Sequence, residues 1–162
     1  MIGRSNDVAK VVLRDPKEFP ELIAGLWSED PLVRMRAADA AEKVTRGSPE
    51  FLQPYKKELL TLMIEAKEQE LRWHLAVMIP RLLLDAKERR LATSALNSYL
   101  EDRSSIVKTC ALQGLADLAR HDPSIRPRVL EILRKAAQSG TPAMKARSRR
   151  LLVHPNALDR WH

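Results

Sequence analysis

Apolar residues recur at helical spacing in one stretch, residues 30–44, which has three weaker copies further along the chain. Asp30-Pro31 opens the stretch with a residue that caps helices, followed by proline at the first helical position, where the missing N–H costs nothing. At 100° per residue the following apolar side chains share one side of a helix: Val33, Ala37, Ala40, Ala41 and Val44. The pattern predicts a helix over 31–46 with a buried stripe centred on Val33.

The copies are found by aligning the aliphatic-basic pair that opens this helix, Val33-Arg34. It matches Leu71-Arg72, Val107-Lys108 and Met144-Lys145, at steps of 38, 36 and 37 residues. A second apolar helix precedes each pair, so one period holds a helical hairpin. We therefore expect a single all-α domain over 1–162 with four hairpins and two terminal caps: 16–47, 48–85, 86–122 and 123–154, with caps at 1–15 and 155–162.

Turn residues set the expected bounds of the individual helices. Pro80 lies inside the expected helix 70–84, where its ring would clash with the carbonyl of Ala76 and kink the helix. The other expected helices cover 7–14, 16–27, 31–46, a segment beginning at Ser48 and turning near Ala66, 86–100, 105–119, 124–137 and 143–152.

The run Asp30-Pro31-Leu32-Val33-Arg34-Met35-Arg36-Ala37-Ala38-Asp39-Ala40 resembles the HEAT-repeat motif. In that motif proline follows aspartate in the turn, a Val-Arg pair opens the second helix, and small residues pack on the first. The resemblance covers residues 16–152, and the chain is most similar to small uncharacterised bacterial HEAT-repeat proteins. It implies a short right-handed α-solenoid whose second helices line a concave face.

Transferring the polar side of helix 31–46 by the repeat steps predicts which side chains face that concave surface. In the first hairpin they are Met35, Asp39, Glu42 and Arg46, flanked by Arg36 and Lys43. In the second they are Trp73, Val77, Pro80 and Leu84, flanked by His74 and Arg81. The third gives Thr109, Gln113, Ala116 and Arg120 with Cys110 and Asp117, and the fourth gives Ala146, Arg150 and Val153 with Arg147 and His154.

The second row is unusual because it is apolar where a polar face is expected. An apolar wall with basic residues at its rim suits a protein or peptide partner, with Trp73 as the anchor. The alternative is that this helix is buried on all sides. We expect a non-enzymatic binding scaffold whose partner-binding residues are Met35, Arg36, Lys43, Trp73, His74, Val77 and Arg81.

Charge changes this picture only at the C-terminal end. The formal net charge is +7, and residues 1–123 are balanced, whereas residues 124–162 hold 9 basic and 2 acidic side chains. Two expected helices carry a basic patch: Arg126, Arg128, Arg134, Lys135, Lys145, Arg147, Arg149 and Arg150. This patch is either a solvated face or a site for nucleic-acid phosphates or an acidic protein, and of the aromatic residues only Trp161 is near it in sequence.

The basic residues that open the second helices also have two interpretations. Arg34, Arg72, Lys108 and Lys145 could form a ladder for phosphates, but their position after the turn favours a structural ladder that binds turn carboxylates or carbonyls between repeats.

Enzymatic chemistry has little support. The four histidines and Cys110 lack metal-ligand spacing, and we expect no cofactor. HEAT-like folds include alkylpurine DNA glycosylases, and that alternative would require Trp73, His74 and Asp39 with Arg147 and Arg150. The N-terminus has no apolar leader and the longest apolar run, 75–80, is far shorter than a membrane span, so we expect a cytoplasmic protein.

Overall fold

The computed structural model describes residues 2–153, with side chains from residue 4 onward, and divides the chain into two compact units. Unit 1 is Met1–Leu83 and unit 2 is Leu84–His162. The described residues are helical, with turns between the helices and no strand, so the all-α prediction is confirmed. The C-terminal cap predicted at 155–162 lies outside the described residues.

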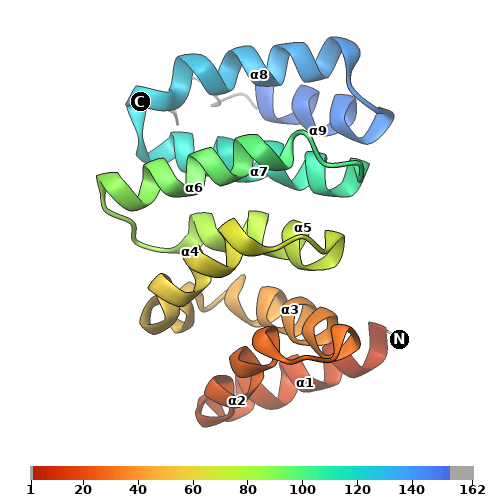
Figure 1. The fold of residues 1–162 in the computed structure, drawn as a ribbon, viewed down its shortest axis with the longest axis vertical. Coiled ribbons are helices and arrows are strands. Elements are labelled where there is room, and N and C mark those ends of the chain that lie inside the picture. The colour runs from red at the N-terminus through yellow and green to blue at the C-terminus, as the bar shows by residue number, and fades with distance from the viewer. Residues whose placement is uncertain (1, 154–162) are drawn as a thin grey trace. The chain divides into compact units, whose positions relative to one another are not determined.

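Unit 1 contains five α-helices within its described residues (Figure 1). They are α1 (Ile2–Arg14), α2 (Phe19–Ala24), α3 (Pro31–Thr45), α4 (Lys56–Glu65) and α5 (Gln69–Met78). Short 3₁₀ helices extend or join them at Pro16–Glu18, Gly25–Trp27, Pro49–Tyr55 and Ile79–Arg81.

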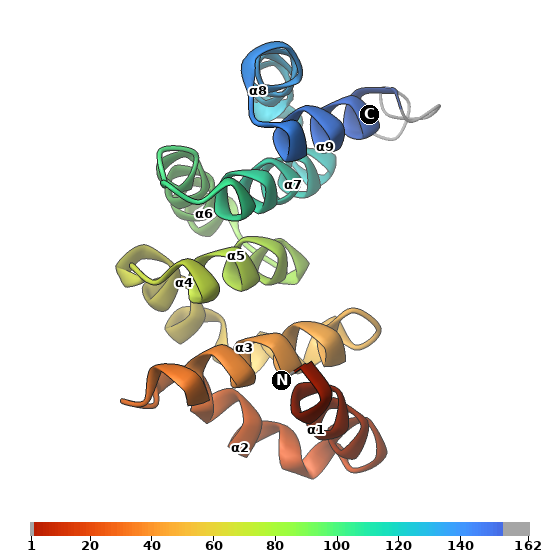
Figure 2. The same ribbon diagram turned by 90° about the vertical axis from the view of Figure 1, so that its right-hand side faces the viewer.

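Unit 2 is more regular: helices α7 and α9 lie in one layer, and helices α6 and α8 lie in the layer beside it (Figure 2). The elements are α6 (Ala86–Tyr99), α7 (Ser105–His121), the 3₁₀ turn Pro123–Ile125, α8 (Arg126–Ser139) and α9 (Pro142–Val153). Helix α7 packs against α6, α8 and α9, and α8 packs against α9.

Side-chain caps explain several helix starts. Asp30 Oδ1 accepts a hydrogen bond from the backbone N–H of Leu32 over 2.9 Å, with Pro31 at the first helical position of α3. Asp85 and Glu88 form a reciprocal capping box at the start of α6. These local signals are those the sequence offers, which is why the observed starts of α3 and α6 agree with the predicted ones.

Helix α3 is the centre of unit 1, packing against α1, α2 and α5. Small side chains permit this contact: Ala38 and Ala41 are fully buried, and a Cβ atom built on Gly25 would lie only 2.7 Å from the Cβ atom of Ala37. Larger residues complete the core of this unit: Ile23, Leu26, Val44, Leu52, Leu59, Met63, Leu75 and Met78. Alanines on α3 therefore set how closely its neighbours approach.

Several expectations about unit 1 are wrong. Val33 is not the centre of a buried stripe: it is 41% exposed, whereas the rest of the expected stripe, Ala37, Ala40, Ala41 and Val44, is buried. The helix expected over 70–84 ends at Met78 and continues as a 3₁₀ turn through Pro80 to Arg81, so the proline ends the α-helix rather than kinking it. Helix α1 begins at Ile2 instead of Asp7.

Candidate functional site

A cleft of about 330 Å³ lies where α1, α3 and α5 of unit 1 meet. Its lining residues are Ser5 from α1, Leu32, Met35, Arg36 and Asp39 from α3, and Trp73 and His74 from α5. We call it the Trp73 cleft. The apolar part is Leu32, Met35 and the partly exposed Trp73, and the polar part is formed by the other four side chains.

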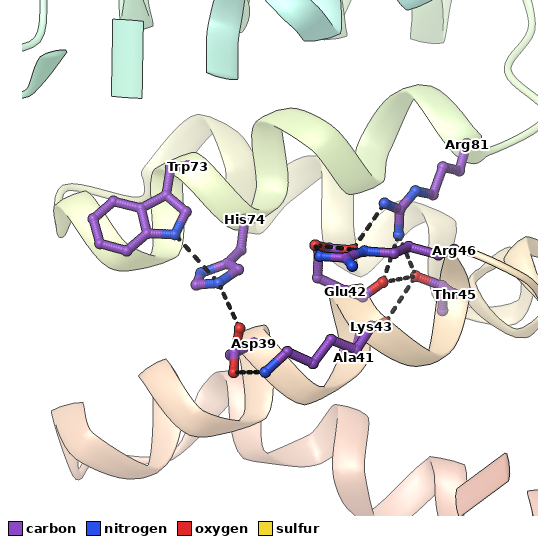
Figure 3. A network of polar contacts seen from close by, with 9 residues as sticks. All are labelled: Asp39, Ala41, Glu42, Lys43, Thr45, Arg46, Trp73, His74 and Arg81. Atoms are coloured by element: carbon purple, nitrogen blue, oxygen red, sulfur yellow. Dashed lines mark hydrogen bonds and ion pairs between the residues drawn. The ribbon is translucent and has the colours of Figure 1, made fainter. Parts of the chain in front are cut away.

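The polar end of the Trp73 cleft is organised by the His74 ring, which is 7% exposed (Figure 3). Its Nδ1 lies 2.6 Å from the backbone carbonyl oxygen of Glu70. A carbonyl oxygen can only accept, so Nδ1 carries a proton and donates it. In the neutral ring Nε2 is then the acceptor, and it receives the indole N–H of Trp73 over 3.2 Å. The histidine thus holds the tryptophan at the cleft.

Asp39 faces the same ring nitrogen from α3, its Oδ1 lying 3.5 Å from His74 Nε2. The Lys43 ammonium bonds the other carboxylate oxygen over 2.6 Å. Burial acts to raise the pKa of Asp39, but hydrogen bonds from Lys43 and Ser5 and the charges of Lys43 and His74 bring the pKa below its usual value. Asp39 is therefore held ionised at the polar end of the Trp73 cleft.

A second cluster lies further along α3, around the Glu42 carboxylate. Arg46 binds both carboxylate oxygens, with Nε at 2.7 Å from Oε2, and Arg81 Nη2 reaches Oε2 over 2.9 Å. Arg81 also donates to the backbone carbonyl of Glu42 and to the Thr45 hydroxyl, each over 2.8 Å. Burial acts to raise the pKa of Glu42, but the hydrogen bonds and charges of Arg46 and Arg81 lower it below its ordinary value.

This cluster corrects the predicted groove wall. Glu42 was placed on the exposed polar side of its helix, but it is only 8% exposed because two guanidinium groups cover its carboxylate. Arg81, predicted at the rim of a binding surface, ties the turn after α5 to the end of α3. Pro80 of the predicted apolar row is buried, and Val77 is partly buried and lies outside the Trp73 cleft.

The structure brings together four of the predicted partner-binding residues in the Trp73 cleft: Met35, Arg36, Trp73 and His74. Lys43 contributes through Asp39 rather than by lining the cleft. Sequence reasoning missed Ser5 and Leu32. Ser5 belongs to the same helical series as the buried Ala9 and Val12, so extending the period of α1 towards its start would have found it.

Two further hollows continue from this cleft over α1. The Val33 hollow, about 280 Å³, shares Ser5 and Arg36 with the Trp73 cleft and is lined also by Arg4, Val8, Glu21, Leu22, Gly25, Val33 and Ala37. The acidic hollow, about 360 Å³, shares Val8, Glu21 and Leu22 with it and adds Asp7, Val11, Val12 and Glu18. Unit 1 thus carries three neighbouring hollows that share lining residues, and the last of them has an acidic lining.

The predicted structural ladder has two similar contacts in unit 1. Arg34 donates to the backbone carbonyl of Ser28 and pairs with the Glu68 carboxylate of the next hairpin. Arg72 Nε donates to the carbonyl of Ala66 over 2.7 Å, so both arginines reach six residues back to the turn before their helix. Lys108, at the matching place in unit 2, makes no side-chain hydrogen bond or ion pair within residues 4–153.

The predicted basic patch in unit 2 divides into engaged and unengaged side chains. Arg126 caps α7 through the carbonyls of Ala119 and Arg120, and Arg147 donates to Gln113 Oε1 over 2.9 Å. Arg128 pairs with Glu131, and Arg149 makes a long contact, 3.5 Å, with the carbonyl of Ala137. Four members make no side-chain hydrogen bond or ion pair with any described residue: Arg134, Lys135, Lys145 and Arg150.

Two further features are absent from the described residues. None of the histidine, cysteine and carboxylate side chains there cluster in a way that could hold a metal ion. No helix within the described part of the chain has the length and apolar character needed to cross a membrane.

Comparison with known proteins finds no relative: no protein-family model, no curated protein and no solved structure matches this chain. The functional argument therefore depends on the residues and contacts described above.

Proposed function

We propose that this protein is a non-enzymatic binding module that holds a segment of a partner protein along the band formed by the Trp73 cleft, the Val33 hollow and the acidic hollow. The observation that supports it most is the Trp73 cleft, where Trp73, Met35 and Leu32 leave apolar surface open to a ligand. Exposed apolar surface of this kind is characteristic of interaction sites, and tryptophan is the residue most enriched among binding hot spots.

The three hollows suggest the chemistry of the partner. Adjoining apolar depressions suit a segment that presents apolar side chains on one face, since each depression takes one anchor. The far end is lined by Asp7, Glu18 and Glu21 and by no basic residue. A partner segment with a basic side chain at that end would complement this charge.

The architecture we propose is a short HEAT-like array, as the repeat in the sequence implies. Two contacts support repetition within unit 1, the matching arginine contacts Arg34 to Ser28 and Arg72 to Ala66. In such an array the second helices carry the partner-binding face, and α3 and α5 hold most of the Trp73 cleft.

The test is a selection of peptides from a random display library on the purified protein, with Trp73→Ala as the counter-selected variant. Trp27→Ala is the matched control, because Trp27 is 42% exposed in the same unit but lies outside all three hollows. We expect peptides that bind the wild type and Trp27→Ala alike and lose at least about tenfold in affinity on Trp73→Ala, the usual size of a hot-spot effect. Failure to select any Trp73-dependent peptide would contradict the proposal.

A second candidate function is binding of nucleic-acid phosphates by unit 2. The observation that favours it is the set Arg134, Lys135, Lys145 and Arg150, which make no ion pair with any described residue. Unengaged basic side chains on neighbouring helices can displace counterions from a phosphate backbone, which makes binding sensitive to salt. Anisotropy titrations of single- and double-stranded oligonucleotides at two salt concentrations distinguish this candidate from the first.

A further inference from the structure

We propose that the Trp73 cleft is coupled to the binding of one proton at His74 Nε2, so that acidification releases the Trp73 indole and weakens the capture of an apolar anchor. The effect of acid on anchor capture rests on the proposed function, whereas the proton site on His74 does not. The proton site itself is a property of the free protein.

The coupling follows from the fixed orientation of the imidazole ring. Nδ1 is committed to the Glu70 carbonyl over 2.6 Å in either charge state, because a carbonyl cannot donate. The only place for an added proton is Nε2. That nitrogen is the acceptor of the Trp73 N–H over 3.2 Å, so protonation converts the acceptor into a donor and breaks this hydrogen bond.

The new N–H has a partner already in place. Asp39 Oδ1 lies 3.5 Å from Nε2, close enough for an ion pair after a small movement. In the neutral state two acceptor atoms face each other there, and a proton between them removes that conflict. The low pKa of Asp39 is consistent with a carboxylate that stays charged while the imidazole changes state.

The charged and polar groups around the ring come from three helices of unit 1. Helix α3 contributes Asp39, Lys43 and Arg36, of which the first two are paired with each other. Helix α1 contributes the uncharged hydroxyl of Ser5, and α5 contributes the Trp73 indole N–H and the backbone carbonyl of Glu70. Within the described residues no side chain of α4 forms a hydrogen bond or ion pair with the ring.

The effect on ligand binding follows from the indole N–H. While the ring is neutral this N–H is satisfied inside the protein, so an apolar anchor can cover Trp73 without leaving a polar group unpaired. In the protonated state the N–H turns to water, and covering it leaves a donor without a partner. We expect affinity for an apolar-anchored peptide to fall about tenfold between pH 7.5 and 5.5, the size of one lost hydrogen bond.

The first experiment follows the indole N–H resonances of the ¹⁵N-labelled full chain from pH 8 to pH 5, using Trp73→Phe to assign the Trp73 signal. The proton resonance of Trp73 should move upfield in one transition as its hydrogen bond is lost. In His74→Gln, which lacks the titrating ring, that transition should be absent. An unmoving signal in the wild type, or the same movement in His74→Gln, would overturn the proton site.

A second variant keeps the test decisive if His74→Gln does not fold. Asp39→Asn removes the charge that receives the Nε2 proton with little change of shape, so the transition should move to lower pH; an unchanged transition would overturn the assignment. The display-selected peptide then measures the coupling. A transition in the free protein with equal peptide affinity at pH 7.5 and 5.5 overturns the coupling alone, while the absence of any Trp73-dependent peptide counts against the proposed function.

Discussion

In each unit a side chain from a later helix, α5 or α9, or from the turn after it, contacts an earlier helix, α3 or α7. The contacted groups are carboxylates in unit 1 and a neutral amide in unit 2. In unit 1, His74 and Arg81 of the α5 region lie against residues 35 and 39 positions earlier, Asp39 and Glu42 on α3, and both of those residues are carboxylates. In unit 2, Arg147 of α9 reaches back 34 residues to the neutral amide of Gln113 on α7. Unit 1 holds equal numbers of basic and acidic residues, 13 of each, whereas unit 2 holds 15 and 8.

This comparison separates the position of a linking residue from its type. The linking residues lie 34 to 39 positions after their partners in both units, close to the steps of 36 to 38 residues expected from the sequence. The residue type is free to vary, and it decides whether the contact is a buried ion pair or an amide hydrogen bond. Unit 1 should therefore respond to loss of a carboxylate and to acid, and unit 2 to salt.

The largest expected effect comes from Glu42→Ala. The change removes the carboxylate that Arg46 and Arg81 share and leaves the partly buried Arg81 guanidinium without its anion. We expect unit 1 to lose about 3 kcal/mol of unfolding free energy, the lower end of the cost of breaking a buried ion pair. The corresponding change in unit 2, Gln113→Ala, should cost about 1 kcal/mol.

Urea unfolding monitors both variants. In a Trp161→Phe background the remaining tryptophans, Trp27 and Trp73, both belong to unit 1, so fluorescence reports that unit and circular dichroism reports all helices. Equal losses in the two variants would contradict the contrast between the units.

The next effect concerns the close packing of α3. Gly25→Ala places a Cβ atom 2.7 Å from that of Ala37, so the two helices must separate. We expect a loss of about 2 kcal/mol from unit 1, as for other overpacked contacts. Gly47→Ala is the matched control, because nothing lies within 4 Å of its added atom, and it should be neutral or slightly stabilising. Thermal unfolding that ranks the two variants equally would show that α3 tolerates a wider separation.

Acid should weaken unit 1 through Asp39 and Glu42. Both have a pKa below their ordinary values of 3.8 and 4.5 in the folded protein, so the unfolded chain binds protons first as the pH falls. Their contribution is fully present above about pH 5 and is lost as the pH drops through the folded values. We expect the urea midpoint of unit 1 to fall as the pH is lowered from 5 to 2.5, because these two carboxylates are then protonated in the folded protein as well.

The control for this acid effect is Glu42→Gln, which starts less stable and should lose less between pH 5 and pH 2.5. Asp122 in unit 2 is another carboxylate whose pKa lies below its ordinary value. A hydrogen bond with the Ser124 hydroxyl lowers this pKa most, burial acts to raise it, and the charge of Arg89 lowers it further. An acid response in Glu42→Gln as large as that of the wild type would assign the effect to other carboxyls.

The smallest expected effect on stability comes from the unengaged basic residues of unit 2. The triple change Arg134→Gln, Lys135→Gln and Arg150→Gln removes side chains that make no described ion pair, so the unfolding free energy should change by less than about 0.5 kcal/mol. If unit 2 binds nucleic acid, the same variant should lose affinity and show a shallower salt dependence. Arg147→Gln is the contrasting change, because it breaks the contact with Gln113.

The sequence predicted the helices better than it predicted their faces. Starts with strong local signals, such as Asp30-Pro31 and Asp85, agree with the structure because capping depends on neighbours in the chain. The exposure of Val33 and the burial of Glu42 were missed, because both depend on tertiary packing. Glu42, for example, is covered by Arg81, which is distant in sequence. Helical periodicity identifies a face but not the element that covers it.

The candidate site was predicted in part for the same reason. Met35 and Arg36 followed from the helical periodicity of 31–46, and the repeat step then gave Trp73, which stood out as apolar in a row expected to be polar, with His74 beside it. Ser5 was missed although extending the helical period of α1 would have found it. The hydrogen bond between Trp73 and His74 could not be predicted, since it requires the ring orientation set by the Glu70 carbonyl.

The most direct test of the central proposal is a chemical-shift map of the ¹⁵N-labelled protein, with methionine methyl groups also labelled, on addition of a display-selected peptide. The account predicts that the Trp73 indole, the Met35 methyl group and backbone signals of α1 and α3 move together and saturate at one affinity, while signals of α8 and α9 stay fixed. Shifts confined to α8 and α9, with the Trp73 and Met35 signals unchanged, would contradict it.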